Sequence, residues 1–448
     1  PSHHHTITPS HHHTITPSHH HTITPLHLQR HPHTPRVYPV RPHHWCTALR
    51  ESIFRRSPGL PPHRRTAVTL LKSASNRSLL ATVLAAALLA GCGEGGGPKL
   101  PPNPPGALAL TSAGRLERGG AVTVAVTADG QAVAPGQVSL TVTPADAAQV
   151  VDGGTLRLLR AGELEVRATS GERTGTIKLT VDAPPTVVFD MSVGGNRDIY
   201  KVALDGGDFA RLTQNVSDER DPSAGGGSVM FVTFRHGNGE LYTIPLAGGT
   251  ETRVTTSTRS ESAPALSADG LRLAYATDPS GVAKLWTALS SGAGAAQAAP
   301  NFGFGGSPET SPSWAPSGNR LAFVGTATGT ADIYTLTLGQ QPELLIGGPA
   351  AEVDPAWSAD GQWVAFASTR EGDPAIFVVR VSDGAVTRLS TRTGTEAEPA
   401  WTKDGRLVYT EFTGTDQTRL VWIDPAAPQT VNPIPVQGGF PRRPSVAQ

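Results

Sequence analysis

One short sequence pattern recurs six times across the C-terminal part of the chain. Each copy reads approximately Glu-x-x-Pro-[Ala/Ser]-[Trp or apolar]-x-x-Asp-Gly and is followed by two short apolar runs separated by a polar turn. Successive prolines are 42, 48, 43, 44 and 45 residues apart, and they are Pro222, Pro264, Pro312, Pro355, Pro399 and Pro444. A period of about 40–50 residues with strand-type segments predicts the blades of a propeller.

A second landmark recurs in phase with the prolines. It is an apolar doublet in the second apolar run, and its copies are Ile199-Tyr200, Leu241-Tyr242, Leu285-Trp286, Ile333-Tyr334, Ile376-Phe377 and Leu420-Val421. With the Asp-Gly turns and a short last segment such as Arg211-Leu212-Thr213, the doublets predict four strands per repeat.

The two ends of the repeat region predict a closed ring. The region begins at Val187-Val188-Phe189, which reads as a second strand with no innermost strand before it. The chain ends near Val446 with an innermost strand that has no second strand after it. We therefore expect Val446 to lie beside Val188, which would complete one blade and remove the open sheet edge.

Two copies carry a family resemblance. Residues 355–361 read Pro-Ala-Trp-Ser-Ala-Asp-Gly and residues 399–405 read Pro-Ala-Trp-Thr-Lys-Asp-Gly, which resembles the TolB-type, or PD40-type, β-propeller repeat. The copies at Pro222 and Pro264 are degenerate. The resemblance implies a six-bladed propeller over residues 184–448. TolB itself carries an α/β domain before its propeller, whereas here an expected immunoglobulin-like domain and lipid anchor stand in that place, so a role in a Tol-Pal-like system stays open.

Residues 107–183 predict a small β-sandwich. Short runs such as 122–126, 138–142 and 177–181 alternate apolar and polar residues, and Asp129-Gly130 marks a turn. The segment resembles bacterial immunoglobulin-like (Ig-like) domains in Gly119-Gly120 and in residues 134–138 and 161–166. We expect it to act as a spacer, with adhesion as the alternative. The predicted fold class is therefore all-β.

The first 67 residues differ from the rest in composition. Residues 1–24 are three copies of Pro-Ser-His-His-His-Thr-Ile-Thr, and a Pro/His/Arg-rich stretch follows. Such a tract cannot bury a core, so we interpret residues 1–67 as disordered or as sequence upstream of the true start. Metal binding by the His triplets is the functional alternative.

Residues 68–91 have the features of a secretory signal. Lys72 and Arg77 precede a twelve-residue, mostly apolar run that is too short to span a bilayer. It ends in Leu89-Ala90-Gly91-Cys92, which resembles the lipobox of bacterial lipoproteins. That resemblance implies a lipid on Cys92 and an anchor in the outer membrane, and it leaves open which side the protein faces. The Gly/Pro-rich residues 92–106 would be a linker.

Five glutamates form the candidate binding site. Each lies three residues before a repeat proline, and they are Glu219, Glu261, Glu309, Glu352 and Glu396. In a propeller these positions lie around the channel mouth, where a ring of carboxylates would attract a cation or a basic partner side chain. The alternative is that each glutamate accepts backbone N–H bonds and joins one blade to the next.

The longest insertion places two aromatic residues on the same face. Phe302 and Phe304 lie in a glycine-rich loop and would form a contact patch for a partner. The alternative is that they pack against the neighbouring blade.

Motifs for catalysis are scarce. The chain contains no Gly-x-Ser-x-Gly elbow, and only His236 of its 16 histidines lies beyond residue 63. Residues 92–448 hold 27 basic and 36 acidic residues, a net charge of −9, which argues against nucleic acid. We expect a monomeric, non-catalytic envelope lipoprotein without metal or cofactor, whose propeller binds a protein or glycan. The alternative is a glycan-active enzyme such as a polysaccharide lyase.

Overall fold

The computed structural model describes residues 107–447, apart from residues 279, 301, 303–305, 391–393 and 415–416. This part of the chain is β-structure with one short 3-10 turn at Pro135–Gln137. Within the same residues, no helix has the length and apolar character needed to cross a membrane. The predictions for residues 1–67, 68–91 and 92–106, and for lipid on Cys92, fall outside the described residues.

The first domain consists of two antiparallel sheets around one core. In β2, Val122, Val124 and Val126 are buried while the residues between them are exposed, as the alternating sequence predicts. They pack in the same cluster as Leu140 and Val166 of the other sheet. One sheet contains β1 (Leu108–Gly114), β2 (Ala121–Ala128), β3 (Gln131–Ala132), β5 (Ala148–Val150) and β6 (Thr155–Leu158); the other contains β4 (Ser139–Thr143), β7 (Gly162–Ser170) and β8 (Arg173–Val181).

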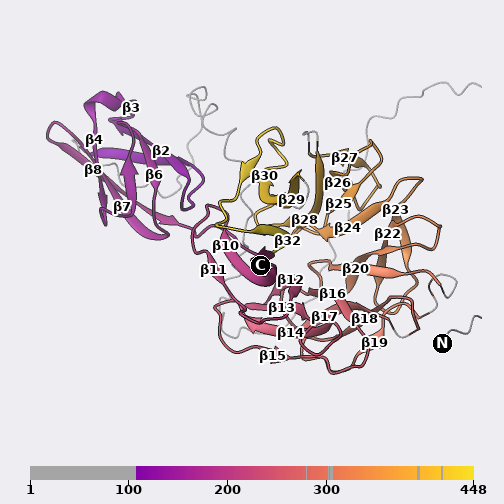
Figure 1. Ribbon diagram of the computed structural model, residues 1–448. Helices are drawn as coiled ribbons and strands as arrows, with labels where there is room; N and C mark the ends of the chain where they lie inside the picture. Colours follow the sequence, from indigo (N-terminus) through magenta and orange to yellow (C-terminus); the bar gives the residue numbers. More distant parts are fainter. Residues whose placement is uncertain are drawn as a thin grey trace, which may run out of the picture. The chain divides into compact units, whose positions relative to one another are not determined.

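The remaining strands form six four-stranded sheets, which confirms the predicted six-bladed propeller. Figure 1 shows the sheets arranged around a centre. Blade 1 consists of β32 (Phe440–Val446), β9 (Thr186–Val193), β10 (Asn196–Ala203) and β11 (Ala210–Arg211); blade 2 of β12 (Glu219–Gly225), β13 (Ser228–Thr233), β14 (Glu240–Pro245) and β15 (Thr252–Arg253); blade 3 of β16 (Glu261–Leu266), β17 (Arg272–Thr277), β18 (Lys284–Leu289) and β19 (Ala296–Gln297).

Blades 4 to 6 repeat this order of strands. Blade 4 consists of β20 (Glu309–Trp314), β21 (Arg320–Gly325), β22 (Asp332–Thr337) and β23 (Glu343–Ile346); blade 5 of β24 (Glu352–Trp357), β25 (Trp363–Ser368), β26 (Ala375–Arg380) and β27 (Val386–Arg388); blade 6 of β28 (Thr395–Trp401), β29 (Leu407–Gly414), β30 (Gln417–Ile423) and β31 (Asn432–Pro433). The innermost strands, which lie nearest to the centre in Figure 1, are β12, β16, β20, β24, β28 and β32.

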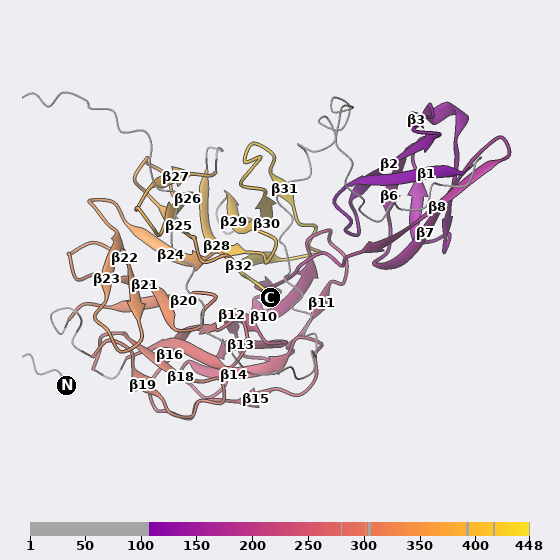
Figure 2. The same cartoon turned by 180° about the vertical axis from the view of Figure 1, so that it is seen from behind.

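The ring closes as the sequence predicts. The C-terminal strand β32 pairs with β9 in antiparallel register, with Ser445 opposite Val188 and Val446 opposite Val187. Both views in Figures 1 and 2 place the C-terminus beside the first blade. Blade 1 is therefore built from the two ends of the propeller segment.

The apolar doublets are explained by packing between the second and third strands. Their aromatic members lie directly opposite an aromatic residue of the second strand in five blades, and in four of these the ring centroids are 5.8 to 6.2 Å apart. These four pairs are Phe189–Tyr200, Phe231–Tyr242, Phe323–Tyr334 and Phe366–Phe377. Cross-strand aromatic pairs of this kind stabilise a sheet and fill the space between stacked blades.

The repeat proline marks a bulge in each innermost strand. The register shifts at this point in all six blades, so the proline's missing N–H removes no ladder hydrogen bond. The residue before each proline has a positive φ of 47° to 59°, although none is glycine: Asp221, Ala263, Ser311, Asp354, Glu398 and Arg443. Such conformations cost energy and persist only where surrounding contacts enforce them.

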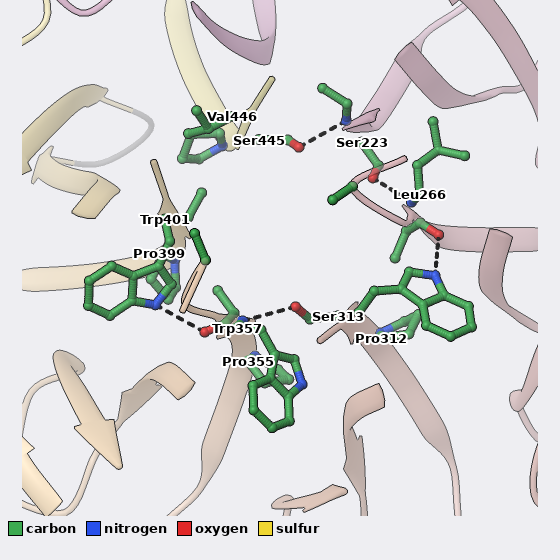
Figure 3. Close-up of a pocket in the computed structure, with 18 of the residues that line it drawn as sticks. Ser223, Leu266, Pro312, Ser313, Pro355, Trp357, Pro399, Trp401, Ser445 and Val446 are labelled. Carbon is green, nitrogen blue, oxygen red and sulfur yellow. Dashed lines mark hydrogen bonds between the residues drawn. The ribbon is translucent and has the colours of Figure 1, made fainter. Parts of the chain in front are cut away.

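Side chains just after the prolines join neighbouring innermost strands (Figure 3). Where that residue is serine, its Oγ accepts a backbone N–H of the next blade, at 2.8 to 3.1 Å. Where it is alanine and the next blade carries tryptophan, the indole donates to the alanine carbonyl, as Trp314 does to Ala265 (3.0 Å) and Trp401 to Ala356 (3.1 Å). At the junction of blades 4 and 5, Ser313 Oγ accepts the backbone N–H of Trp357. The indole Nε1 of Trp357 has no hydrogen-bond partner among the described residues.

This alternation predicts unequal effects of two serine substitutions. Ser223→Ala removes the acceptor for Leu266 N–H and is expected to lower the free energy of unfolding by about 1–2 kcal/mol. Ser313→Ala should cost about 1 kcal/mol less, because the free Trp357 indole can then donate to the carbonyl of residue 313. Urea unfolding measures both values. Equal losses, or a larger loss for Ser313→Ala, would contradict the interpretation.

Candidate functional site

The predicted glutamates lie at one end of the propeller. In the strand register of blade 2, Glu219 lies opposite Thr233, and Thr233 lies opposite Glu240. The start of the innermost strand, the end of the second strand and the start of the third strand therefore lie at the same end of the blade. We call this end, formed by the loops that lead into the innermost strands and those that join second to third strands, the glutamate face. All five glutamates are only 0 to 3% exposed.

Among the described residues, Glu219, Glu309 and Glu352 form ion pairs with more exposed basic residues. Glu219 pairs with Arg235 at 2.6 Å, Glu309 with Lys284 at 2.8 Å and Glu352 with Arg370 at 2.9 Å. Lys284 belongs to blade 3 and Glu309 to blade 4, so this pair crosses a junction. Burying a carboxylate is costly unless it is paired and hydrogen-bonded, and these cations supply that compensation.

Hydrogen bonds also connect the glutamates to the preceding blade. Leu285 N–H donates directly to Glu309 at 3.1 Å. Thr255, which follows β15 of blade 2, donates its hydroxyl to Glu261 of blade 3 at 2.8 Å while accepting Leu241 N–H. Thr213 makes the same two contacts, with Ile199 N–H and Glu219. These contacts match the alternative in which the glutamates join blades. Direct contact of the five with a ligand remains a prediction.

Burial also alters the protonation of two of these carboxyls. Desolvation raises the pKa of Glu219 and of Glu261 above its ordinary value, against the hydrogen bonds and nearby cations that lower it. Both groups are therefore poor candidates for a freely solvated anionic ring.

Two arginines of the glutamate face are more exposed than the buried glutamates with which they pair. The side chain of Arg235 is 17% exposed against 0% for Glu219, and that of Arg370 is 24% exposed against 1% for Glu352. Guanidinium groups thus lie beside two of the five predicted carboxylates, and Arg235 also pairs with the partly exposed Glu251 at 2.6 Å. Both guanidiniums are also fixed within the protein, Arg235 by a hydrogen bond to Thr233 at 3.0 Å and Arg370 by one to Ser368 at 3.1 Å. Partly exposed guanidiniums held in place in this way suit recognition of carboxylates.

Phe302 packs inside blade 4. Its ring lies 5.5 Å from that of Phe323 and 4.7 Å from that of Tyr334, both in edge-to-face geometry. The absence of a side chain at Gly325 leaves room for it, since a Cβ there would lie 3.0 Å from the Phe302 ring. This is the packing alternative from the sequence. Phe304 falls outside the described residues.

A charged network lies deeper, at the residues that precede the repeat prolines. Arg443 of the closing strand pairs with Asp221 of blade 2 at 2.8 Å and with Asp190 of β9 at 3.4 Å. Glu398 of blade 6 accepts Arg443 N–H at 2.8 Å and pairs with Arg442 at 2.7 Å. Desolvation raises the pKa of the fully buried Asp190, while Arg443 and Arg197 oppose this shift.

Asp354 occupies the same position in blade 5. It accepts the backbone N–H of Glu398, and burial together with the Glu398 charge raises the pKa of Asp354 to about 6.

Toward the other end of the channel, the prolines and the residues after them enclose a cavity of about 200 Å³, framed by the labelled residues of Figure 3. Among the described residues, no cluster of three or more His, Cys, Asp or Glu is arranged to hold a metal.

The arginines that pair with buried glutamates were missed from the sequence. Arg235 and Arg370 each lie two residues after the end of a second strand, and Arg253 lies in a fourth strand, where it pairs with Glu240 at 2.5 Å. The recurrence of arginine after second strands and in fourth strands was the sequence signal that could have indicated these ion pairs. It could not show that a guanidinium lies beside a particular glutamate, because the two are far apart along the chain.

The raised pKa of Asp354 predicts a pH-dependent stability. The folded state binds this proton more tightly than the unfolded chain, so the contribution of Asp354 to stability rises as the pH falls from above 6 toward 4. At pH 7 the charged carboxyl is a cost, and Asp354→Asn should raise the free energy of unfolding by about 1–3 kcal/mol. Asparagine also tolerates the positive φ.

Urea unfolding of wild type and Asp354→Asn at pH 7 and pH 4 measures this effect. The difference should vanish near pH 4, where both side chains are neutral. Asp373→Asn, at an exposed loop position, is the control. An Asp354→Asn variant that is no more stable at pH 7, or that keeps its advantage at pH 4, would refute the assignment.

Comparisons with known proteins agree with this architecture. Residues 295–431 match the family model described as the TolB beta propeller domain. The structure of TolB from Acinetobacter baumannii is 15% identical with a TM-score of 0.54, covering 69% of this chain and 83% of that one. No curated protein matched the chain.

Two further solved structures share less of the geometry. Putative TolB from Agrobacterium tumefaciens is 20% identical with a TM-score of 0.47, covering 56% of this chain and 87% of that one. A puromycin-hydrolyzing peptidase from Mycobacterium tuberculosis is 16% identical with a TM-score of 0.41, covering 67% and 54%. The matched repeats and the Acinetobacter structure identify residues 186–446 as a TolB-like six-bladed β-propeller.

Proposed function

We propose that this protein is a bacterial envelope lipoprotein whose propeller is a non-catalytic scaffold for a protein or glycan partner. The observation that carries the proposal is the closed ring with a glutamate face on which the partly exposed Arg235 and Arg370 pair with buried carboxylates. The TolB-like fold supports a protein-binding role. In this proposal the glutamates hold these cations in place, and Phe302 supports blade 4.

The geometry favours binding by a preformed surface. Every junction of the ring contains hydrogen bonds or ion pairs between blades, and the strands beneath the loops are buried on both sides. A surface held in this way loses little conformational entropy when a partner binds. The residues before strand β1 would link this surface to the membrane, and the β-sandwich would be a spacer.

The scaffold role predicts that one face of the propeller captures an envelope component. Arg259 lies exposed in the loop before β16 on the glutamate face, and Lys403 lies exposed in a turn at the opposite end. In a Cys46→Ala background, polyethylene glycol attached at Arg259→Cys should block capture by steric exclusion, whereas the same chain at Lys403→Cys should not.

Capture is measured with the tagged full-length protein in envelope extracts and on glycan arrays, followed by mass spectrometry. Saturable binding lost only with the label at position 259 is the expected result. Absence of saturable binding in the unlabelled protein, or equal loss with either label, would reject the proposed surface. Shortening of a bound polysaccharide would reject the non-catalytic assignment.

The anchor predicts a lipid on Cys92. In a bacterial host, radiolabelled palmitate should mark the protein and the protein should sediment with membranes, because its acyl chains insert in the bilayer. Cys92→Ala should abolish both signals, while Cys46→Ala should change neither. Equal labelling of Cys92→Ala and wild type would contradict the anchor.

A further inference from the structure

Exposed apolar side chains of the propeller gather at one place. Seven large apolar residues are exposed among the described residues of the propeller, and four of them lie on the glutamate face around blades 1 and 2. They are Val193 (47% exposed), Val216 (96%), Phe234 (41%) and Phe440 (44%). Contiguous apolar groups rimmed by polar residues mark interaction sites, whereas scattered ones do not.

Backbone pairing and hydrogen bonds place the segments that carry these four residues side by side. Phe440 begins β32 and lies opposite Ser192, the residue before Val193. Val193 lies opposite Asn196, whose side chain donates to the carbonyl of Asn215, the residue before Val216, at 2.7 Å. The four residues, which we call the seam patch, thus span the closing strand and the junction of blades 1 and 2.

The second half of the seam patch is joined in the same way. Asp218, two residues after Val216, accepts Arg197 N–H at 3.0 Å, and its carbonyl accepts Phe234 N–H at 3.4 Å. Arg220 stacks over the Phe234 ring at 5.6 Å. Phe234 is therefore held beside the loop that carries Val216.

Arginines with less exposed acids form the rim of the seam patch. Arg220 pairs with Asp218, Arg197 with Asp190 and Arg442 with Glu398. In each pair the guanidinium is the more exposed member: 43% against 31%, 20% against 0% and 32% against 11%. A ligand at this surface meets apolar side chains flanked by N–H donors, a composition enriched in protein interfaces.

We propose that the seam patch binds an acidic peptide segment of a partner protein, with an aromatic or aliphatic side chain packed on Val216, Phe234 and Phe440. Carboxylates beside that side chain would pair with the guanidiniums of Arg197, Arg220 and Arg442. The inference rests on the proposed scaffold function and names its partner class. Residues 1–91 of this chain carry 10 basic residues and one acidic residue, a net charge of +9, so they do not complement this surface.

The test uses the full-length protein and random dodecapeptides displayed on phage. Peptides retained by wild type should be enriched in Asp or Glu next to Phe, Tyr, Trp or Leu. The double variant Val216→Asp/Phe440→Ser should bind the selected peptides about tenfold or more weakly in fluorescence anisotropy. Added salt should weaken binding, because it screens carboxylate–guanidinium pairs.

The matched control is Leu289→Asp/Leu344→Ser. These leucines are 56% and 54% exposed, and they lie at the far end of β18 and in the outermost strand β23. Affinity unchanged in the control and reduced in the seam variant supports the proposal. Selection of basic peptides, no enriched peptide, or equal weakening in both variants would overturn it.

Two further outcomes separate this inference from the scaffold function. If the seam variant still captures the envelope component, the scaffold stands and the seam patch is not its site. If phosphatidylglycerol vesicles bind the seam patch and no peptide does, the surface recognises lipid and the proposal is wrong. Loss of every saturable interaction in wild type would reject both.

Discussion

The pairing of β32 with β9 is the interaction on which the rest of the propeller depends. Five blades are continuous in sequence, but blade 1 exists only when the C-terminal strand returns to the start of the ring. Without it, β9 would lose its pairing partner and present an open sheet edge, and β28 would lose the strand of the next blade whose Arg443 N–H donates to Glu398. The closing strand also carries Arg443, which reaches carboxylates on β9 and β12 and so couples the seam to the next blade.

The repeated Glu-x-x-Pro pattern follows from the position of the innermost strand between two blades. The glutamate lies where that strand begins and accepts hydrogen bonds that come from the preceding blade. The residue before the proline adopts a left-handed conformation, and the proline lies in the bulge that follows. The glutamate that bonds to the preceding blade therefore lies three residues before the proline, at the bulge where the innermost strand bends.

The electrostatics of the glutamate face also follow from burial. Carboxylates at the starts of the innermost strands are enclosed by neighbouring blades, so each needs a cation or hydroxyl beside it. Those cations come from loops at the surface and remain partly exposed. A region with a glutamate in five of the six repeats can therefore also present guanidinium groups to a partner, and at the seam these groups lie beside exposed apolar side chains.

The repeat period, the four strands per blade and the closure of the ring were all predictable from the sequence. They depend on local periodicity and on the incomplete repeats at each end of the propeller segment, and both can be read from one sequence. The sequence also placed Glu219, Glu309 and Glu352 at the correct level of the ring and allowed for two roles. It could not decide between those roles, because exposure depends on what other blades place above each carboxylate.

The alternation of serine and tryptophan bonds at the junctions illustrates the same limit. Ser313 and Trp357 are visible in the sequence, but their contact joins residues 44 positions apart in adjacent blades. Likewise, Val193, Val216, Phe234 and Phe440 form one patch only because β32 returns to β9 and the loop at Asp218 contacts both blades. The sequence by itself determined the fold, since strands and turns follow from local patterns; the tertiary structure decided which side chains meet solvent, since exposure depends on contacts between distant residues.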